Sequence, residues 1–111
     1  MKYGLKEEQW KVVREVLSAH PEIEQAVLFG SRAVGDYKEA SDVDLALKGE
    51  GVDASLAAGV RFEIEEDTWL PFFFDVVAYS DIQNPDLRKQ IDEFGKVIYE
   101  KGSSISVGNS I

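Results

Sequence analysis

Three short apolar segments, well separated along the chain, constrain its fold most strongly. They are residues 26–29, 43–47 and 72–78. Each is bounded by glycine, proline or lysine and carries apolar side chains on both faces of an extended chain, which is typical of buried strands. The segments therefore predict a small sheet whose faces are largely covered by helices.

Helical segments lie around and between these strands. Residues 5–19 and 54–66 repeat apolar side chains at helical spacing. Asn84 followed by Pro85 is a typical helix start, and residues 96–99 predict a short edge strand. The order of elements predicts an α/β (α+β) fold, with a small mixed sheet of three to four strands flanked by helices.

The length of the chain, 111 residues, predicts one domain. We place that domain at residues 1–101. Residues 102–111 consist largely of Ser, Gly and Asn, which predicts a disordered tail.

Composition excludes several classes of site. The absence of Cys removes disulfides and Cys-ligated metals, and the single His20 removes a His-rich metal site; we expect His20 at the surface, after a helix C-terminus. Twelve Lys and Arg against 21 Asp and Glu give a net charge of -9, which disfavours direct nucleic-acid binding. With no membrane-length apolar run and no secretory start, the expected location is the cytoplasm.

Three aspartates are the strongest candidates for chemistry. Asp42 and Asp44 alternate with apolar residues as the second strand begins, so both point to one face. Asp75 interrupts the apolar third strand, where an unpaired charge is unfavourable. If the second and third strands are neighbours, all three carboxylates share a face and suit Mg²⁺ or Mn²⁺. Taken singly, each also has a structural explanation, such as a solvated strand edge.

A glycine–serine pair follows the first strand. Gly30 and Ser31 are placed to offer backbone N–H groups and a hydroxyl to a phosphate, although such a pair alone is often only a turn. Carboxylates beside a phosphate-binding turn indicate metal-assisted attack at phosphorus, in which paired metal ions stabilise the attacking and leaving oxygens.

Gly30-Ser31, Asp42-x-Asp44 and a later Asp75 together resemble the DNA polymerase beta-type nucleotidyltransferase superfamily, and its minimal nucleotidyltransferase (MNT) branch in particular. The resemblance implies an α/β core, ATP or another nucleoside triphosphate as donor, and two Mg²⁺ ions, with Mn²⁺ as an alternative. It also implies that Asp42 and Asp44 bind the metals, and that Asp75 completes the catalytic metal site and helps to deprotonate the acceptor.

By the same resemblance, Gly30 and Ser31 hold the triphosphate. Arg32 is assigned to nucleotide binding, with contact to a partner protein or a solvent-exposed position as alternatives. Relatives often carry a second Arg in this motif, where the present chain has Val34. This departure removes one cation that would approach a phosphate.

Minimal members of the branch are commonly paired with a helical HEPN toxin, and some transfer AMP to a tyrosine of that toxin. The resemblance therefore implies an antitoxin with nucleotidyltransferase activity. A binding-only antitoxin and a nucleotidyltransferase acting on a small molecule are the alternatives. Template-dependent polymerisation is disfavoured, because the chain has no basic cluster. The sequence leaves the oligomeric state open.

Two further groups have mainly structural interpretations. Trp69 and residues 72–74 are expected in the core, and exposure of Trp69 or Phe73 would make them a candidate partner surface. The acidic residues at 63–67 are expected on a solvated helix face.

Overall fold

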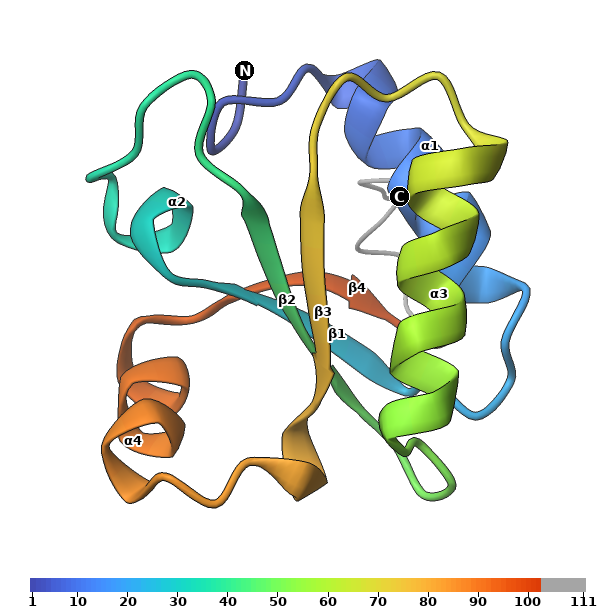
Figure 1. The fold of residues 1–111 in the computed structure, drawn as a ribbon, viewed down its shortest axis with the longest axis vertical. Coiled ribbons are helices and arrows are strands. Elements are labelled where there is room, and N and C mark those ends of the chain that lie inside the picture. Colours follow the sequence, from blue (N-terminus) through green and yellow to red (C-terminus); the bar gives the residue numbers. More distant parts are fainter. Residues whose placement is uncertain (103–111) are drawn as a thin grey trace.

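Four strands form one mixed sheet in the order β3-β2-β1-β4 in the computed structural model, which describes residues 1–102 (Figure 1). β1 (Gln25–Phe29) pairs antiparallel with β2 (Val43–Lys48) and with β4 (Lys96–Glu100), whereas β3 (Phe74–Ala78) runs parallel to β2. The predicted fold class is confirmed, and the fourth strand lies at an edge as expected.

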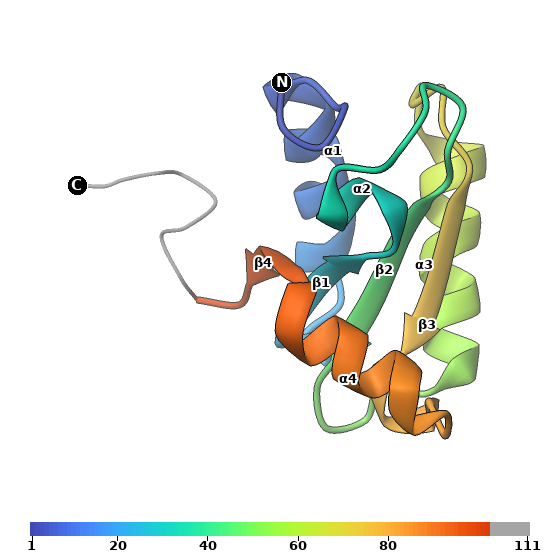
Figure 2. The same cartoon turned by 90° about the vertical axis from the view of Figure 1, so that its left-hand side faces the viewer.

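Helices α1 (Glu7–Ser18) and α3 (Ala54–Asp67) cover one face of the sheet (Figures 1 and 2). The carboxylate of Asp53 accepts a hydrogen bond from the backbone N–H of Leu56, which caps the start of α3. The parallel β2–β3 pair requires a long crossover, and α3 provides it.

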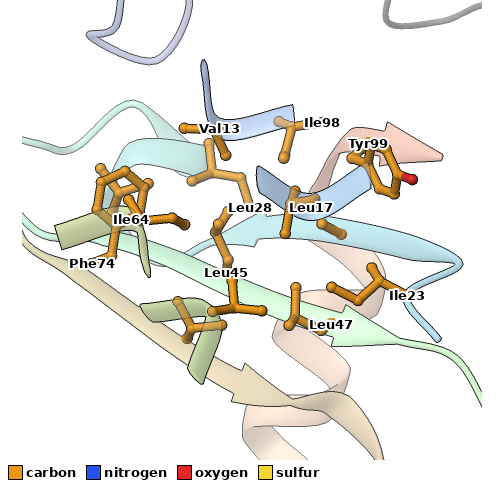
Figure 3. Close-up of a cluster of buried hydrophobic side chains, with 14 of the residues drawn as sticks. Val13, Leu17, Ile23, Leu28, Leu45, Leu47, Ile64, Phe74, Ile98 and Tyr99 are labelled. Atoms are coloured by element: carbon orange, nitrogen blue, oxygen red, sulfur yellow. The ribbon is translucent and has the colours of Figure 1, made fainter. Parts of the chain in front are cut away.

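The main core lies between these two helices and the sheet. It is built from side chains that project to one face at every second strand position and from the inner stripes of the helices. Ten of these residues are labelled in Figure 3: Val13, Leu17, Ile23, Leu28, Leu45, Leu47, Ile64, Phe74, Ile98 and Tyr99.

Two shorter helices, α2 (Ser31–Val34) and α4 (Pro85–Phe94), lie on the opposite side of the sheet (Figure 1). A smaller apolar cluster forms beneath α4 from Val27, Phe29, Ala46 and Ile91. Ala46 lies two positions after Asp44 on β2, so this cluster is on the same face of the sheet as Asp44.

The prediction that Trp69 and residues 72–74 lie in the core is wrong for two of these residues. Trp69 is 60% exposed and Phe73 is 72% exposed, whereas Phe74 is 2% exposed. β3 begins at Phe74, so Trp69 and Phe73 belong to the connection from α3, which crosses the end of the sheet.

His20 and Glu63 also differ from expectation. Both are half-buried, and Nε2 of His20 lies 2.5 Å from Oε1 of Glu63. This contact joins the end of α1 to α3, so neither side chain is simply solvated.

Among residues 1–102, no helix is both long and apolar enough to cross a membrane. Of the predicted tail at 102–111, residues 103–111 lie outside the described part of the chain.

Candidate active site

Asp44 and Asp75 are partners across the parallel pair of strands β2 and β3. Partners in register on neighbouring strands point to the same face of a sheet. Their neighbours Val43, Leu45, Phe74 and Val76 are all buried in the main core, so the two carboxylates project from the opposite face. The expectation that the second and third strands are adjacent is confirmed.

Asp42 lies two residues before Asp44, with the fully buried Val43 between them. Alternation along the chain therefore places Asp42 on the face that carries Asp44 and Asp75. Burial, followed by the charges of Asp75 and Asp42, raises the pKa of Asp44 to about 6, while Arg32 acts in the opposite direction. The charges of Asp75 and Asp42 thus lie close enough to act on Asp44.

Gly30 lies against Asp44. It follows Phe29, which pairs with Asp44 across β1 and β2, and its φ is 77°. A methyl group at Gly30 would stand 2.3 Å from Oδ2 of Asp44. The turn after β1 therefore depends on glycine for two reasons, a left-handed backbone conformation and the close approach of a carboxylate.

Ser31 begins the short helix α2, beside Gly30. The helix ends at Gly35, which is left-handed with φ 84°, and the carbonyl of Ser31 accepts the backbone N–H of Asp36 at 2.9 Å. Val34, the position at which relatives often carry Arg, is 48% exposed. The Gly-Ser turn and the aspartates are brought together, as the sequence predicts.

Arg32 takes a different position from those we predicted. Its side chain is only 1% exposed, so the solvent-exposed alternative is wrong. The guanidinium donates to the carbonyl of Ser41 through Nε at 3.1 Å and Nη2 at 2.8 Å, and to the carbonyl of Tyr3 at 2.9 Å. It also contacts the carbonyl of Glu39 at 3.2 Å.

Two aromatic rings complete the surroundings of Arg32. Its guanidinium carbon lies 4.9 Å from the ring centre of Tyr37 and 5.2 Å from that of Phe72. These contacts are structural: Arg32 holds the loop that leads to Asp42 against the N-terminal segment. A direct contact between this buried guanidinium and a nucleotide has no support in the structure.

The donor set fits a hard divalent cation. Carboxylate oxygens are the ligands that Mg²⁺ and Mn²⁺ prefer, and mutual repulsion among like charges favours a cation between them. Within residues 1–102, however, no three acidic or histidine side chains already converge closely enough to enclose a metal ion. The aspartates are neighbours on one face rather than a closed ligand cage.

Asp75 also borders a groove of about 290 Å³ along the outer edge of β3. The other walls of the groove come from α3 and from the turn after β3. Its lining residues are Ala54, Ala57, Ala58, Arg61, Asp75, Val76, Val77, Ala78, Asp81 and Ile82.

The family described as "Polymerase beta, Nucleotidyltransferase" matches residues 11–104. The chain belongs to this family. The match includes every candidate site residue, from Gly30 to Asp75. No curated protein sequence matches the chain significantly.

Solved structures agree with the family fold. A toxin–antitoxin crystal structure with AMP-PNP superposes with a TM-score of 0.68 at 21% identity, covering 88% of this chain and 76% of that one. A mutant of the toxin–antitoxin pair MntA-HpeT gives 0.65 at 18% identity, with 88% and 75% covered. A putative nucleotidyltransferase from Sulfolobus solfataricus gives 0.52 at 21% identity, with 86% and 80% covered.

Sequence reasoning missed two features of this nucleotidyltransferase domain. Arg32 is buried in part by its contact with Tyr3, which lies 29 positions away in the sequence. No local sequence pattern predicts this burial. The position of Phe73 could have been predicted from the sequence, because alternation from Asp75 places residue 73 on the face of the aspartates. Residues 72–74 are three consecutive phenylalanines, and this apolar run was predicted as a whole to lie in the core.

Proposed function

We propose that this chain is a metal-dependent nucleotidyltransferase that transfers AMP from ATP to a hydroxyl group of a partner protein and acts as an antitoxin. The in-register placement of Asp44 and Asp75 beside Gly30 carries the proposal. It joins a group suited to divalent cations to a turn suited to phosphate, which is the combination that phosphoryl transfer requires.

The side chains of Asp42, Asp44 and Asp75 would bind one or two Mg²⁺ ions, and Mn²⁺ would be able to replace Mg²⁺. When bound, the metal supplies neutralisation of the charge that develops on the phosphate oxygens. The backbone at Gly30 and the Ser31 hydroxyl would hold the triphosphate, oriented by the turn that begins α2.

The reaction itself is an exchange of phosphorus–oxygen bonds. The acceptor oxygen forms a bond to the α-phosphorus, the bond from that phosphorus to the bridging oxygen breaks, and pyrophosphate leaves. Asp75, which is exposed, would take the proton of the acceptor hydroxyl. The partly buried Asp44 would serve mainly as a fixed metal ligand.

The acceptor proposal rests on the resemblance to antitoxins of the MNT branch, and its candidate partner is a HEPN toxin modified on tyrosine. Of the three solved structures compared above, the two with the higher TM-scores are toxin–antitoxin pairs, one of them with AMP-PNP. Both support an antitoxin role for this chain. One observation favours a second candidate, a binding-only antitoxin: Val34 provides no cation at an exposed position of the phosphate-binding turn.

The test is transfer of label from α-labelled ATP, in the presence of Mg²⁺, to the product of an adjacent gene that encodes a HEPN-type protein. Label on the acceptor that disappears in Asp42→Asn and Asp44→Asn supports the proposal. Equal labelling by these variants would refute it. If the variants transfer nothing but still protect cells from the toxin, the chain neutralises the toxin by binding, and the part of the proposal that links transfer to antitoxin action is refuted.

A further inference from the structure

Phe73 is an exposed aromatic residue that belongs neither to the core nor to the proposed metal site. Its side chain is 72% exposed. On one side, Phe72 packs against the main core and Arg32, and on the other side Phe74 is buried within that core. Since alternate residues of an extended chain point to opposite faces, the ring of Phe73 projects on the face of Asp75.

The backbone places Phe73 next to Asp42. The N–H of Val43 donates to the carbonyl of Phe73 at 3.0 Å, which continues the parallel pairing one step beyond Val43 and Phe74. In the same register, Asp44 stands beside Asp75. One corner of the sheet therefore presents three carboxylates and one phenyl ring.

The carboxylates and the Gly30 turn at this corner suit the charged part of a nucleotide. The aspartates and the Gly30 turn would hold metal ions and phosphates, whereas a nucleobase is flat and largely uncharged. An exposed aromatic ring is the usual protein surface for stacking a base. With a rise of about 3.3 Å per residue, the Cα atoms of Phe73 and Asp75 lie about 7 Å apart, so the ring stands close to the aspartates.

We propose that Phe73 stacks on the nucleobase of the donor nucleotide. This inference rests on the proposed function, since it concerns the same site and names the residue that binds the base. Stacking on a phenyl ring tolerates every base. Phe73 would therefore strengthen nucleotide binding without selecting strongly between adenine and guanine.

Calorimetric titration of the whole chain with two ligands tests the proposal. The first ligand is AMP-PNP and the second is inorganic tripolyphosphate, which has the charges but no base, both with Mg²⁺. Phe73→Ser is expected to weaken AMP-PNP binding about tenfold and tripolyphosphate binding less than twofold. Phe73→Trp should keep the affinity of the wild type for both ligands.

The matched control is Phe62→Ser. Phe62 is 63% exposed, similar to Phe73, but it lies on α3, which packs against the opposite face of the sheet. It should bind both ligands as the wild type does. The proposal is overturned if Phe73→Ser binds AMP-PNP as the wild type does. A loss of label on the acceptor in that variant would then show that Phe73 contacts the partner protein instead of the nucleobase.

Equal loss of both ligands in Phe73→Ser would also overturn the proposal, because the ring would then support the phosphate site. A wild type that binds both ligands equally overturns the stacking role alone. A wild type that binds neither ligand refutes the proposed function together with it.

Discussion

Gly30 and Asp44 approach so closely that no side chain fits between them: a methyl group on Gly30 would stand 2.3 Å from the Asp44 carboxylate oxygen. Gly30→Ala should therefore displace that carboxylate. We expect nucleotide transfer to fall on the order of 100-fold, because a shift of about 1 Å in a reacting group has an effect of this size. The measurement is the initial rate of transfer of labelled AMP.

Gly35→Ala is the matched control for this prediction. Gly35 also has a positive φ, 84°, but nothing lies within 4 Å of the position its Cβ would take. It should lose about 1 kcal/mol of stability through backbone strain and keep its transfer rate. Equal losses of rate in both variants would show that backbone strain, and not the approach to Asp44, controls the site.

The elevated pKa of Asp44 predicts a pH-dependent stability. The folded state keeps the proton of Asp44 up to about pH 6, whereas the unfolded chain releases it near 3.8. The folded state thus binds more protons between these values, so the free energy of unfolding falls as pH rises from about 4 to 6. After allowance for solvent screening, the fall is about 1 to 2 kcal/mol.

Asp44→Asn should remove this dependence and be more stable than the wild type at pH 7.5, by about the same 1 to 2 kcal/mol. Urea unfolding in EDTA across this pH range measures the difference between the two proteins. Asp36→Asn, an exposed aspartate of the loop after α2, should follow the wild type. An Asp44→Asn protein that is less stable than the wild type at pH 7.5 contradicts the prediction.

Arg32→Met should destabilise the fold by about 3 kcal/mol, since it leaves the carbonyls of Tyr3, Glu39 and Ser41, whose hydrogen bonds to Arg32 are partly buried, without their donor. Arg32→Lys should recover only part of this loss, because an ammonium group lacks the planar fork of the guanidinium. Chemical denaturation gives both values.

Arg61→Met serves as the control for the loss of a cation. Arg61 is a largely exposed residue of α3 paired with Glu65 at 3.5 Å, and its removal should change stability by less than about 0.5 kcal/mol. If Arg32→Met is no more destabilising than Arg61→Met, the structural role assigned to Arg32 is wrong.

Val34→Arg should strengthen the binding of tripolyphosphate about fivefold, because it restores a cation beside the Gly-Ser turn at a position that is already exposed. Calorimetric titration measures the gain. Val97→Arg, on edge strand β4 and 44% exposed, controls for added charge. A gain of the same size in both variants would mean that Val34 has no special position relative to the phosphates.

The strands, the helices and the shared face of the aspartates were all predictable, since each follows from a local period. Alternation across Val43 places Asp42 with Asp44, and helical spacing predicts α1, α3 and α4 to within a few residues at each end. The pairing of Asp44 with Asp75 needed one further step, the adjacency of two strands, which the crossover through α3 favours.

The failures are of two kinds: Arg32, whose neighbours are distant in sequence, and apolar residues that no other element covers. Arg32 follows a motif associated with phosphate, yet it is buried by contacts with Tyr3 and Phe72. Trp69 and Phe73 are apolar, but the connection that carries them lies beyond the end of the strand. Apolar character predicts burial only where another element is available to cover the side chain.

The burial of Phe74 has a consequence for the fidelity of folding. If β3 shifted its register by one residue along β2, Phe74 would face away from the main core and the charge of Asp75 would be buried in it. Such a misregistered chain would be strongly disfavoured. The buried side chain of Phe74 thus fixes the register of β3 on β2. A mutation to a smaller residue would disturb the position of the neighbouring Asp75 carboxylate before it unfolded the domain.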